Sequence, residues 1–366
     1  MDAHGLLLPM IYFRRVAVER VAWRYRMVAA ITAPGMRSHD MTQDIAISSG
    51  YTAALSGAAL AAEDSAGRIL MRGRDRAELL HRLSTNDIVA LRPGQGARTV
   101  LTSPIGRIID LLTVHALDDA LLVVTSADQG APVYSLLRKN IFFNDQVTLE
   151  PAGRSHGQLA LYGPAATDML GQVFGAFDTP ALHGITRVAF DGTEVWLARR
   201  LPLGGPSFTL FVPQPQVDAL RHTLVAAGAA QLDRDSFDQL RIEQGYGTFG
   251  HELSLEYIPL ETGLLDAISF TKGCYVGQEI IARMESRGRL AKQLRGLRLD
   301  GLPAAPAKLE IDGKEAGDLT SAIVSPRFGP IALAYVRSAH AAPDTRLQIT
   351  GSAISGVVVE LPFAME

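Results

Sequence analysis

Residues 272–279 read KGCYVGQE and hold the single cysteine, Cys274, of a chain of 366 residues. A run typical of a short helix follows, from Gln278 to Arg283. The start of a helix has free backbone N–H groups and partial positive charge, and Lys272 adds a full charge. Both effects favour the thiolate, so Cys274 is a candidate nucleophile, metal ligand or redox sensor. The alternative is a small buried residue without chemistry, the commoner role of a free cysteine, although core packing does not require the flanking lysine and glycines.

The composition describes a globular protein, with 47% hydrophobic and 20% charged residues and a formal net charge of −3. This length predicts two or three domains, and the charge gives no drive toward direct nucleic-acid binding. One cysteine excludes an intrachain disulfide, which fits a reducing, cytoplasmic compartment. It also excludes a self-contained four-thiolate cluster, and the nine histidines show no ligand spacing, so we expect no metal site. No apolar run is long enough to predict a membrane span.

Residues 1–40 differ from the rest of the chain, because an apolar run is followed by several arginines with few acids. No basic segment precedes the apolar run, so a secretory signal is not expected. An organelle transit peptide is one interpretation. The preferred one is a start at Met41, with a disordered or mis-annotated extension before it.

Residues 41–290 alternate strand-like and helix-like runs, which predicts an α+β region in two related lobes, at about 41–155 and 156–290. Within the first lobe, a hairpin is expected around residues 104–106. Asp75 and Glu78 have the spacing of a helix capping box.

Residues 291–366 contain six short β-like runs, separated by Gly and Pro every eight to twelve residues or so. This pattern predicts a small C-terminal antiparallel β-barrel.

The cysteine motif, with the later Arg283 and Gly288, resembles the K-G-C-Y-x-G-Q-E…A-R…R-G signature of the YgfZ/Iba-type folate-binding proteins. These proteins belong to the glycine-cleavage T-protein superfamily. Shorter matches to the family's patterns extend from about Tyr51 to the end of the chain. They are TNDI at 85–88, GRIID at 106–110, LRIEQG at 240–245, IPLE at 258–261 and IALAYV at 331–336.

This resemblance implies two α+β lobes and a barrel around a central hole that binds tetrahydrofolate or a one-carbon derivative. It also implies a cytoplasmic, monomeric accessory protein that supports iron–sulfur cluster assembly or repair, and through cluster enzymes tRNA modification. Its expected partners are reduced folate and iron–sulfur proteins or their assembly machinery.

The alternative is a folate-dependent aminomethyltransferase or another one-carbon transferase of the T-protein type. In those enzymes an Asp-Asp pair and a T-G-E motif supply carboxylates, which suit a pterin because its ring edge offers paired donors. Here the pair is Asp110-Leu111 and residues 203–206 read LGGP, although Arg199 is kept. These losses argue against aminomethyl transfer, and whether the chain is an enzyme stays open.

Four other acids are candidates to compensate for the lost carboxylates: Glu243, Glu252, Glu256 and Glu261. Glu261 lies in a matched motif. The resemblance assigns the reactive role to Cys274 and Lys272, with the thiol opening onto a cavity for a reduced pteridine.

All the candidate cofactor-binding residues except Arg199 lie in the matched motifs. Apart from Arg199 and Glu261, each has an ordinary structural alternative at a strand end, in a turn or loop, at a helix start or on the surface. The candidates are Asp110, Thr85, Asn86, Arg199, Glu261, Tyr275, Gln278, Glu279 and Arg283.

Overall fold

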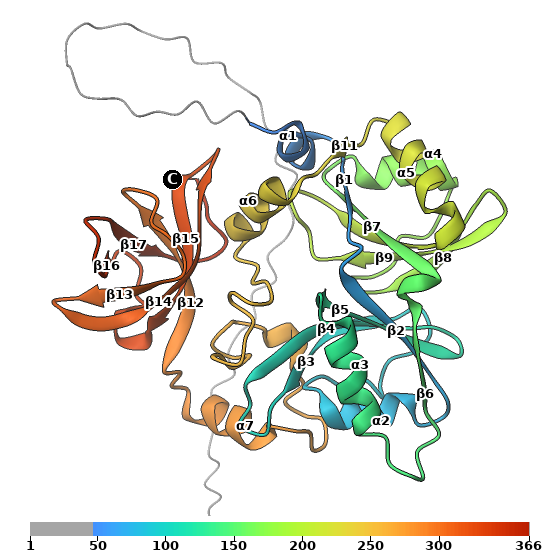
Figure 1. Ribbon diagram of the computed structural model, residues 1–366, viewed down its shortest axis with the longest axis horizontal. Helices are drawn as coiled ribbons and strands as arrows, with labels where there is room; N and C mark the ends of the chain where they lie inside the picture. The colour runs from blue at the N-terminus through green and yellow to red at the C-terminus, as the bar shows by residue number, and fades with distance from the viewer. Residues whose placement is uncertain (1–46, 366) are drawn as a thin grey trace, which may run out of the picture. The chain divides into compact units, whose positions relative to one another are not determined.

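The computed structural model describes residues 47–365, which form two open β-sheets with helices and one closed barrel (Figure 1). The α+β class, the two lobes and the C-terminal barrel predicted from the sequence are confirmed. Among these residues, no helix is both long and apolar enough to cross a membrane.

The first sheet has five antiparallel strands in the order β3-β4-β5-β2-β6. Its strands are β2 (Ala66–Arg72), β3 (Gly96–Thr102), β4 (Ile108–Ala116), β5 (Ala120–Ala127) and β6 (Thr148–Pro151). Helices α2 (Arg76–Leu83) and α3 (Gly130–Lys139) cover one face of this sheet (Figure 1). The predicted hairpin around residues 104–106 is confirmed as the β3–β4 pair.

Strand alternation divides the first sheet between two cores. In β2, Ile69 and Met71 pack under α2 and α3, whereas Leu70 packs with Ala198 and Phe211 of the second sheet. Successive residues of a strand point to opposite faces, so the inner face of this sheet is free to meet the second lobe.

The second sheet has six strands in the order β11-β1-β7-β10-β9-β8, antiparallel except for β1 and β11. Its strands are β1 (Ala59–Ala62), β7 (His156–Tyr162), β8 (Ile185–Phe190), β9 (Thr193–Arg200), β10 (Ser207–Pro213) and β11 (Ala230–Gln231). Helices α4 (Ala166–Phe174) and α5 (Val217–Ala226) pack on it through Leu170 and Leu220.

The pairing differs from the predicted lobe ranges at one place. Strand β1 lies within the range 41–155 that was assigned to the first lobe, but it pairs with β7 and β11 of the second sheet. A short strand joins whichever sheet offers a free edge or gap, and sequence pattern does not show that choice.

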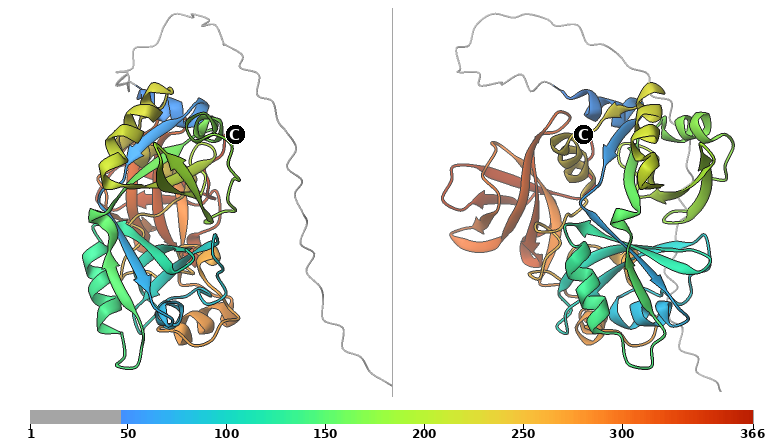
Figure 2. Two further views of the ribbon diagram at one scale, coloured as in Figure 1. Left: turned by 90° about the vertical axis from the view of Figure 1, so that its right-hand side faces the viewer. Right: turned by 45° about the vertical axis from the view of Figure 1, so that its right-hand side comes forward.

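The barrel is closed and antiparallel in the order β12-β15-β14-β13-β16-β17 (Figure 2). Its strands are β12 (Lys292–Leu299), β13 (Ala307–Ile311), β14 (Lys314–Ser325), β15 (Gly329–Arg337), β16 (Arg346–Ile349) and β17 (Ser355–Val359). The remaining helices are α1 (Ser49–Ser56), α6 (Arg234–Gln244) and α7 (Gln278–Arg287). Short 3-10 turns are η1 (Ala152–Arg154), η2 (Gln214–Gln216), η3 (Leu265–Ala267) and η4 (Ser338–His340).

The predicted capping box at α2 is wrong. Asp75 is the N-cap residue, but its side chain makes no cap hydrogen bond. Its Oδ2 instead accepts from the backbone N–H of Gln146, at 2.8 Å, in the segment before β6. A tertiary contact therefore replaces the local one.

Two fully buried acids, Glu243 and Glu252, attach the barrel to α6. Glu252 accepts from Arg241 of α6 at 3.2 Å, and from the hydroxyls of Thr320 and Ser321 of β14 at 2.7 and 2.6 Å. Burying a carboxylate is costly unless it is paired and hydrogen-bonded, and these partners satisfy both conditions.

Glu243 makes the second attachment. It accepts from Tyr51 of α1 at 2.7 Å, from Ser325 of β14, and from Arg327. These bonds explain the Arg and Glu of the LRIEQG segment as structural residues, and they leave neither Glu243 nor Glu252 free to replace a lost ligand-binding carboxylate.

We expect Glu252→Ala to lower the free energy of unfolding by about 3–5 kcal/mol, because it leaves the buried guanidinium of Arg241 without its main partner. Urea denaturation measures this. Glu315→Ala is the matched control, since Glu315 pairs with Arg337 on the exposed surface and such pairs add little. Equal stability of the two variants would contradict the role given to Glu252.

Candidate functional site

A cavity of about 200 Å³ lies between the two lobes, here called the inter-lobe cavity. Its walls come from β3 and β4 of the first sheet, from β7, the turn before β8 and the end of β9 in the second, and from α6 with the loop after it. The lining residues are Arg98, Leu111, Thr113, Tyr162, His183, Arg200, Leu201, Leu203, Phe237, Arg241, Tyr246, Gly247 and Thr248. Six of these residues are aliphatic or aromatic and six are polar, three of them arginines. Small-molecule sites likewise combine apolar walls with polar groups.

A smaller cavity of about 80 Å³ shares Thr113 and Arg200 with the first. It is lined also by Glu63, His115 and Arg199. Arg199, a predicted cofactor-binding residue, is exposed and lines this smaller space.

An ion pair that sequence reasoning missed stands where the two cavities meet. Arg200 Nη1 donates to Glu63 Oε1 at 2.8 Å, and Tyr162 and Gln158 also donate to Glu63. Burial acts to raise the pKa of Glu63, but Arg200 and these hydrogen bonds outweigh it and hold the pKa below its usual range. Glu63 and Arg200 are 137 positions apart, so no local motif connects them.

Asp110, predicted to face the pterin, points the other way. In the middle of β4, Asp110, Leu112 and Val114 are buried and alternate with Leu111 and Thr113. Leu112 and Val114 pack in the core under α2 and α3, whereas Leu111 and Thr113 line the inter-lobe cavity. The carboxylate of Asp110 accepts from the N–H of Leu111 at 2.9 Å and of Ser126 at 3.2 Å. Period-two alternation therefore makes the leucine of Asp110-Leu111 the cavity residue, and the retained acid is the one facing away.

Thr85 and Asn86 are also displaced from both cavities. Thr85 is fully buried and donates to Ala267 O at 2.6 Å, while the amide of Asn86 donates to Arg98 O and Asp266 O at 2.8 and 3.0 Å. These bonds fasten the first lobe to the η3 turn. Both residues therefore have a structural role.

Glu261 is buried and accepts from the N–H of Ile258 at 3.2 Å, which closes the turn of the IPLE segment. Burial raises the pKa of Glu261. It lies 3.9 Å from Arg107 and lines neither cavity, and Glu256 is exposed. Neither acid supplies the lost cavity carboxylate.

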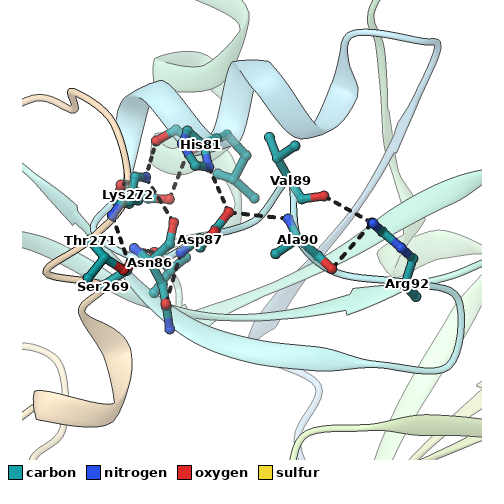
Figure 3. A network of polar contacts seen from close by, with 12 residues as sticks. His81, Asn86, Asp87, Val89, Ala90, Arg92, Ser269, Thr271 and Lys272 are labelled. Atoms are coloured by element: carbon teal, nitrogen blue, oxygen red, sulfur yellow. Dashed lines mark hydrogen bonds and ion pairs between the residues drawn. The ribbon is translucent and has the colours of Figure 1, made fainter.

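The ammonium of Lys272 binds backbone carbonyl groups of the first lobe (Figure 3). It donates to the carbonyl oxygens of His81, Ser84 and Asn86, the last two at 2.7 and 2.8 Å. It also lies 5.1 Å from the ring centre of Tyr275. Burial lowers the pKa of Lys272 to about 8. The predicted activation of the cysteine by this lysine has no support in these contacts.

Cys274 is exposed, which excludes the alternative of a buried packing residue. It precedes α7, whose N-cap is Gly277 in the left-handed conformation at φ 84°. Cys274 lines neither cavity, so the predicted opening of the thiol onto the pteridine space is wrong for these two cavities.

The other motif residues also stay outside the two cavities. Tyr275 packs with Ile258, Leu260, Ile268 and Ile281. Glu279 and Arg283 pair across one turn of α7 at 3.1 Å, on the exposed surface, and Gln278 is the first residue of the helix. The structure thus separates the cysteine motif from the inter-lobe cavity.

Comparison with known proteins agrees with this architecture. The family model of the GCVT N-terminal domain matches residues 12–272, and that of the glycine cleavage T-protein C-terminal barrel domain matches residues 292–364. The first match begins within residues 1–40, where the sequence predicted an extension, and that segment lies outside the described residues. The chain belongs to the glycine cleavage T-protein family.

Several individual proteins are similar to this chain. A chloroplastic protein of Arabidopsis thaliana named "Putative transferase" is 31% identical, over 81% of this chain and 69% of its own. The aminomethyltransferase of Pelodictyon phaeoclathratiforme is 30% identical, over 81% and 84%. The crystal structure of aminomethyltransferase T from Bartonella henselae has the same fold, with a TM-score of 0.78 at 22% identity, covering 86% of this chain and 88% of its own. The YgfZ/Iba subtype predicted from the cysteine motif is not distinguished by these matches.

We expect Lys272→Met to cost roughly 3 kcal/mol of unfolding free energy, because three carbonyl oxygens lose a charged donor. Cys274→Ala, two positions away and exposed, should stay within about 0.5 kcal/mol of wild type. Parallel urea titrations compare the two variants. A Lys272→Met protein as stable as Cys274→Ala would show that the ammonium is not a structural anchor.

Burial raises the pKa of Asp110 to about 6 in the folded protein, from a value of 3.8. The folded protein therefore binds more protons than the unfolded chain between these values. The contribution of Asp110 to stability is fully present below about pH 4 and is lost as the pH rises through 6, a change of roughly 3 kcal/mol.

The measurement is the free energy of unfolding of wild type and Asp110→Asn from pH 4 to pH 7. As the pH rises over this range, the free energy of unfolding of wild type should fall relative to that of Asp110→Asn, since asparagine does not titrate. A difference that is constant with pH would contradict the raised pKa.

Proposed function

We propose that this protein is a folate-dependent one-carbon transferase of the T-protein type, with a reduced folate in the inter-lobe cavity. The observation that carries the proposal is the cavity itself, walled by both lobes and α6 of a T-protein fold. Relatives named aminomethyltransferase match 81% of the chain and 84% of their own length, which supports the same class of activity.

The residues present fit the ring of a folate better than its whole length. At about 200 Å³ the cavity is smaller than the roughly 300–1,000 Å³ of sites that enclose a drug-sized ligand. Leu111, Leu203 and Phe237, with the rings of Tyr162 and Tyr246, offer apolar surface for a flat heterocycle. The glutamate tail of a folate would then extend outward.

Charge on the walls is balanced, which suits a neutral ring. Arg98 pairs with Asp266 at 2.6 Å, and Arg200 and Arg241 pair with Glu63 and Glu252. Arg199 has no ion pair with any residue between 47 and 365, and it lines the adjoining smaller cavity. We assign it to the folate carboxylates, to which a free guanidinium is well matched.

Tetrahydrofolate, when bound, supplies the ring nitrogen that carries the one-carbon unit. The chain's own part is to bind the ring, exclude water and hold polar atoms at its edge. Because Leu111 takes the cavity position of the Asp-Asp pair, no carboxylate stands on this wall. Aminomethyl transfer from a lipoyl carrier protein is therefore expected to be weak, and another one-carbon donor is the better substrate class.

The second candidate is a tetrahydrofolate-binding, monomeric accessory protein for iron–sulfur cluster assembly or repair, which acts indirectly on tRNA modification. One observation favours it: Cys274 is exposed, in a motif whose other residues are largely tied into structure. In that function the thiol acts on an iron–sulfur protein at the surface, apart from the cavity.

One experiment tests the proposal and separates it from the second candidate. Wild type and Cys274→Ala are titrated with tetrahydrofolate by calorimetry, assayed for one-carbon transfer, and introduced into a strain deficient in iron–sulfur enzyme maturation. A transferase predicts equal folate binding and equal transfer rates for both proteins, because Cys274 lines neither cavity.

The accessory function predicts equal folate binding but loss of rescue by Cys274→Ala. Absence of tetrahydrofolate binding to wild type at millimolar ligand would overturn both functions. Binding without transfer of any one-carbon unit, together with rescue by wild type only, would overturn the transferase in favour of the accessory protein.

A further inference from the structure

His183 is a buried histidine of the inter-lobe cavity to which neither the sequence motifs nor the family matches give a role. It lies in the turn before β8, is 8% exposed, and lines the cavity. Neither Nδ1 nor Nε2 has a hydrogen-bond partner among the described residues. The carboxylate of Asp266 lies nearby, but its Oδ2 is 4.0 Å from Nε2, beyond hydrogen-bond distance.

An imidazole with two unbonded nitrogens is costly inside a protein. Neutral histidine carries one donor and one acceptor, and buried polar atoms are nearly always satisfied by protein or by a bound molecule. Here the remaining source of partners is whatever occupies the cavity, a ligand or water. The unsatisfied ring therefore indicates a binding position.

The backbone of His183 is held in place independently of the ring. Its φ of 63° is in the left-handed region, which is uncommon for a residue other than glycine. Its N–H donates to Arg199 O at 2.9 Å, and its carbonyl accepts from His115 Nδ1 at 2.8 Å. Gly96 leaves space for this carbonyl, since a Cβ at that position would lie 2.0 Å from it.

Burial, together with the charges around the ring, keeps it neutral. The pKa of His183 falls to about 4, mainly because of burial, with Arg98 and Arg200 acting in the same direction and Asp266 in the opposite one. Arg98 and Arg200 come from different lobes and both line the cavity, which places the imidazole between the two walls. At neutral pH it offers a donor and an acceptor without a charge.

We propose that His183 binds the ligand of the inter-lobe cavity directly, donating to and accepting from a neutral, planar heterocycle of the reduced pteridine class. This inference rests on the proposed folate site. His183 and Leu111 line the same cavity, so the histidine supplies polar atoms to a space in which the acid of the Asp-Asp pair has become aliphatic.

The test uses the full chain and tetrahydrofolate as the probe. His183→Asn removes the ring but suits the left-handed backbone, because asparagine adopts positive φ more readily than most residues. We expect its dissociation constant by calorimetry to rise about tenfold or more, as for the loss of a buried hydrogen bond. His222→Asn, at an exposed position of α5, is the matched control and should bind like wild type.

A second measurement does not depend on a variant's folding. In wild type labelled with ¹⁵N-histidine, the ring nitrogens of His183, assigned by their absence in His183→Asn, should shift when tetrahydrofolate is added. A residue with only a structural role would not show this shift.

The outcomes separate the two claims. Binding by wild type with no shift of the His183 ring, or with equal affinity in His183→Asn, would overturn the role of His183 and leave the folate site standing. No binding by wild type would overturn the folate site, and the role of His183 with it. A shift of the His183 ring nitrogens on binding, together with weaker binding by His183→Asn, would support both the folate site and the role of His183.

Discussion

The buried ion pair between Arg241 and Glu252 connects the parts of this protein that matter for function. Arg241 belongs to α6 and lines the inter-lobe cavity, while Glu252 holds β14 of the barrel through two hydroxyls. Both side chains are almost fully buried, so each charge requires the other. Through Glu252, the barrel therefore fixes the position of Arg241 in the cavity wall. The shape of the cavity depends on this attachment of the barrel to α6.

The position of a side chain on a strand decides what remains of the ligand site. Asp110 and Leu111 are neighbours, yet one lies under the helices of the first lobe and the other lines the cavity. The loss of one acid from the pair is therefore a loss of the cavity acid. Arg200, which pairs with Glu63, and His183 are polar residues of the inter-lobe cavity, and the proposed binding of a neutral ring depends on them.

The cysteine motif divides into structural and exposed parts. Lys272 and Tyr275 are fastened to other elements, and Gly277 forms the left-handed start of α7. Cys274, by contrast, is exposed to solvent. Most of the motif can thus be understood as the frame of a loop that presents one thiol, at a place separate from the cavity.

The sequence by itself determined the local elements: the six barrel strands, the β3–β4 hairpin and α7 all appear near their predicted ranges. Alternation, glycine and proline placement and helical period act over a few residues, so they can be read along the chain. The tertiary structure alone decided that β1 joins the second sheet, that Leu111 and not Asp110 meets the cavity, and that Glu63, Arg200 and His183 come together. The reason is that a strand's pattern shows that it has two faces, but only the packing of distant segments determines what each face meets.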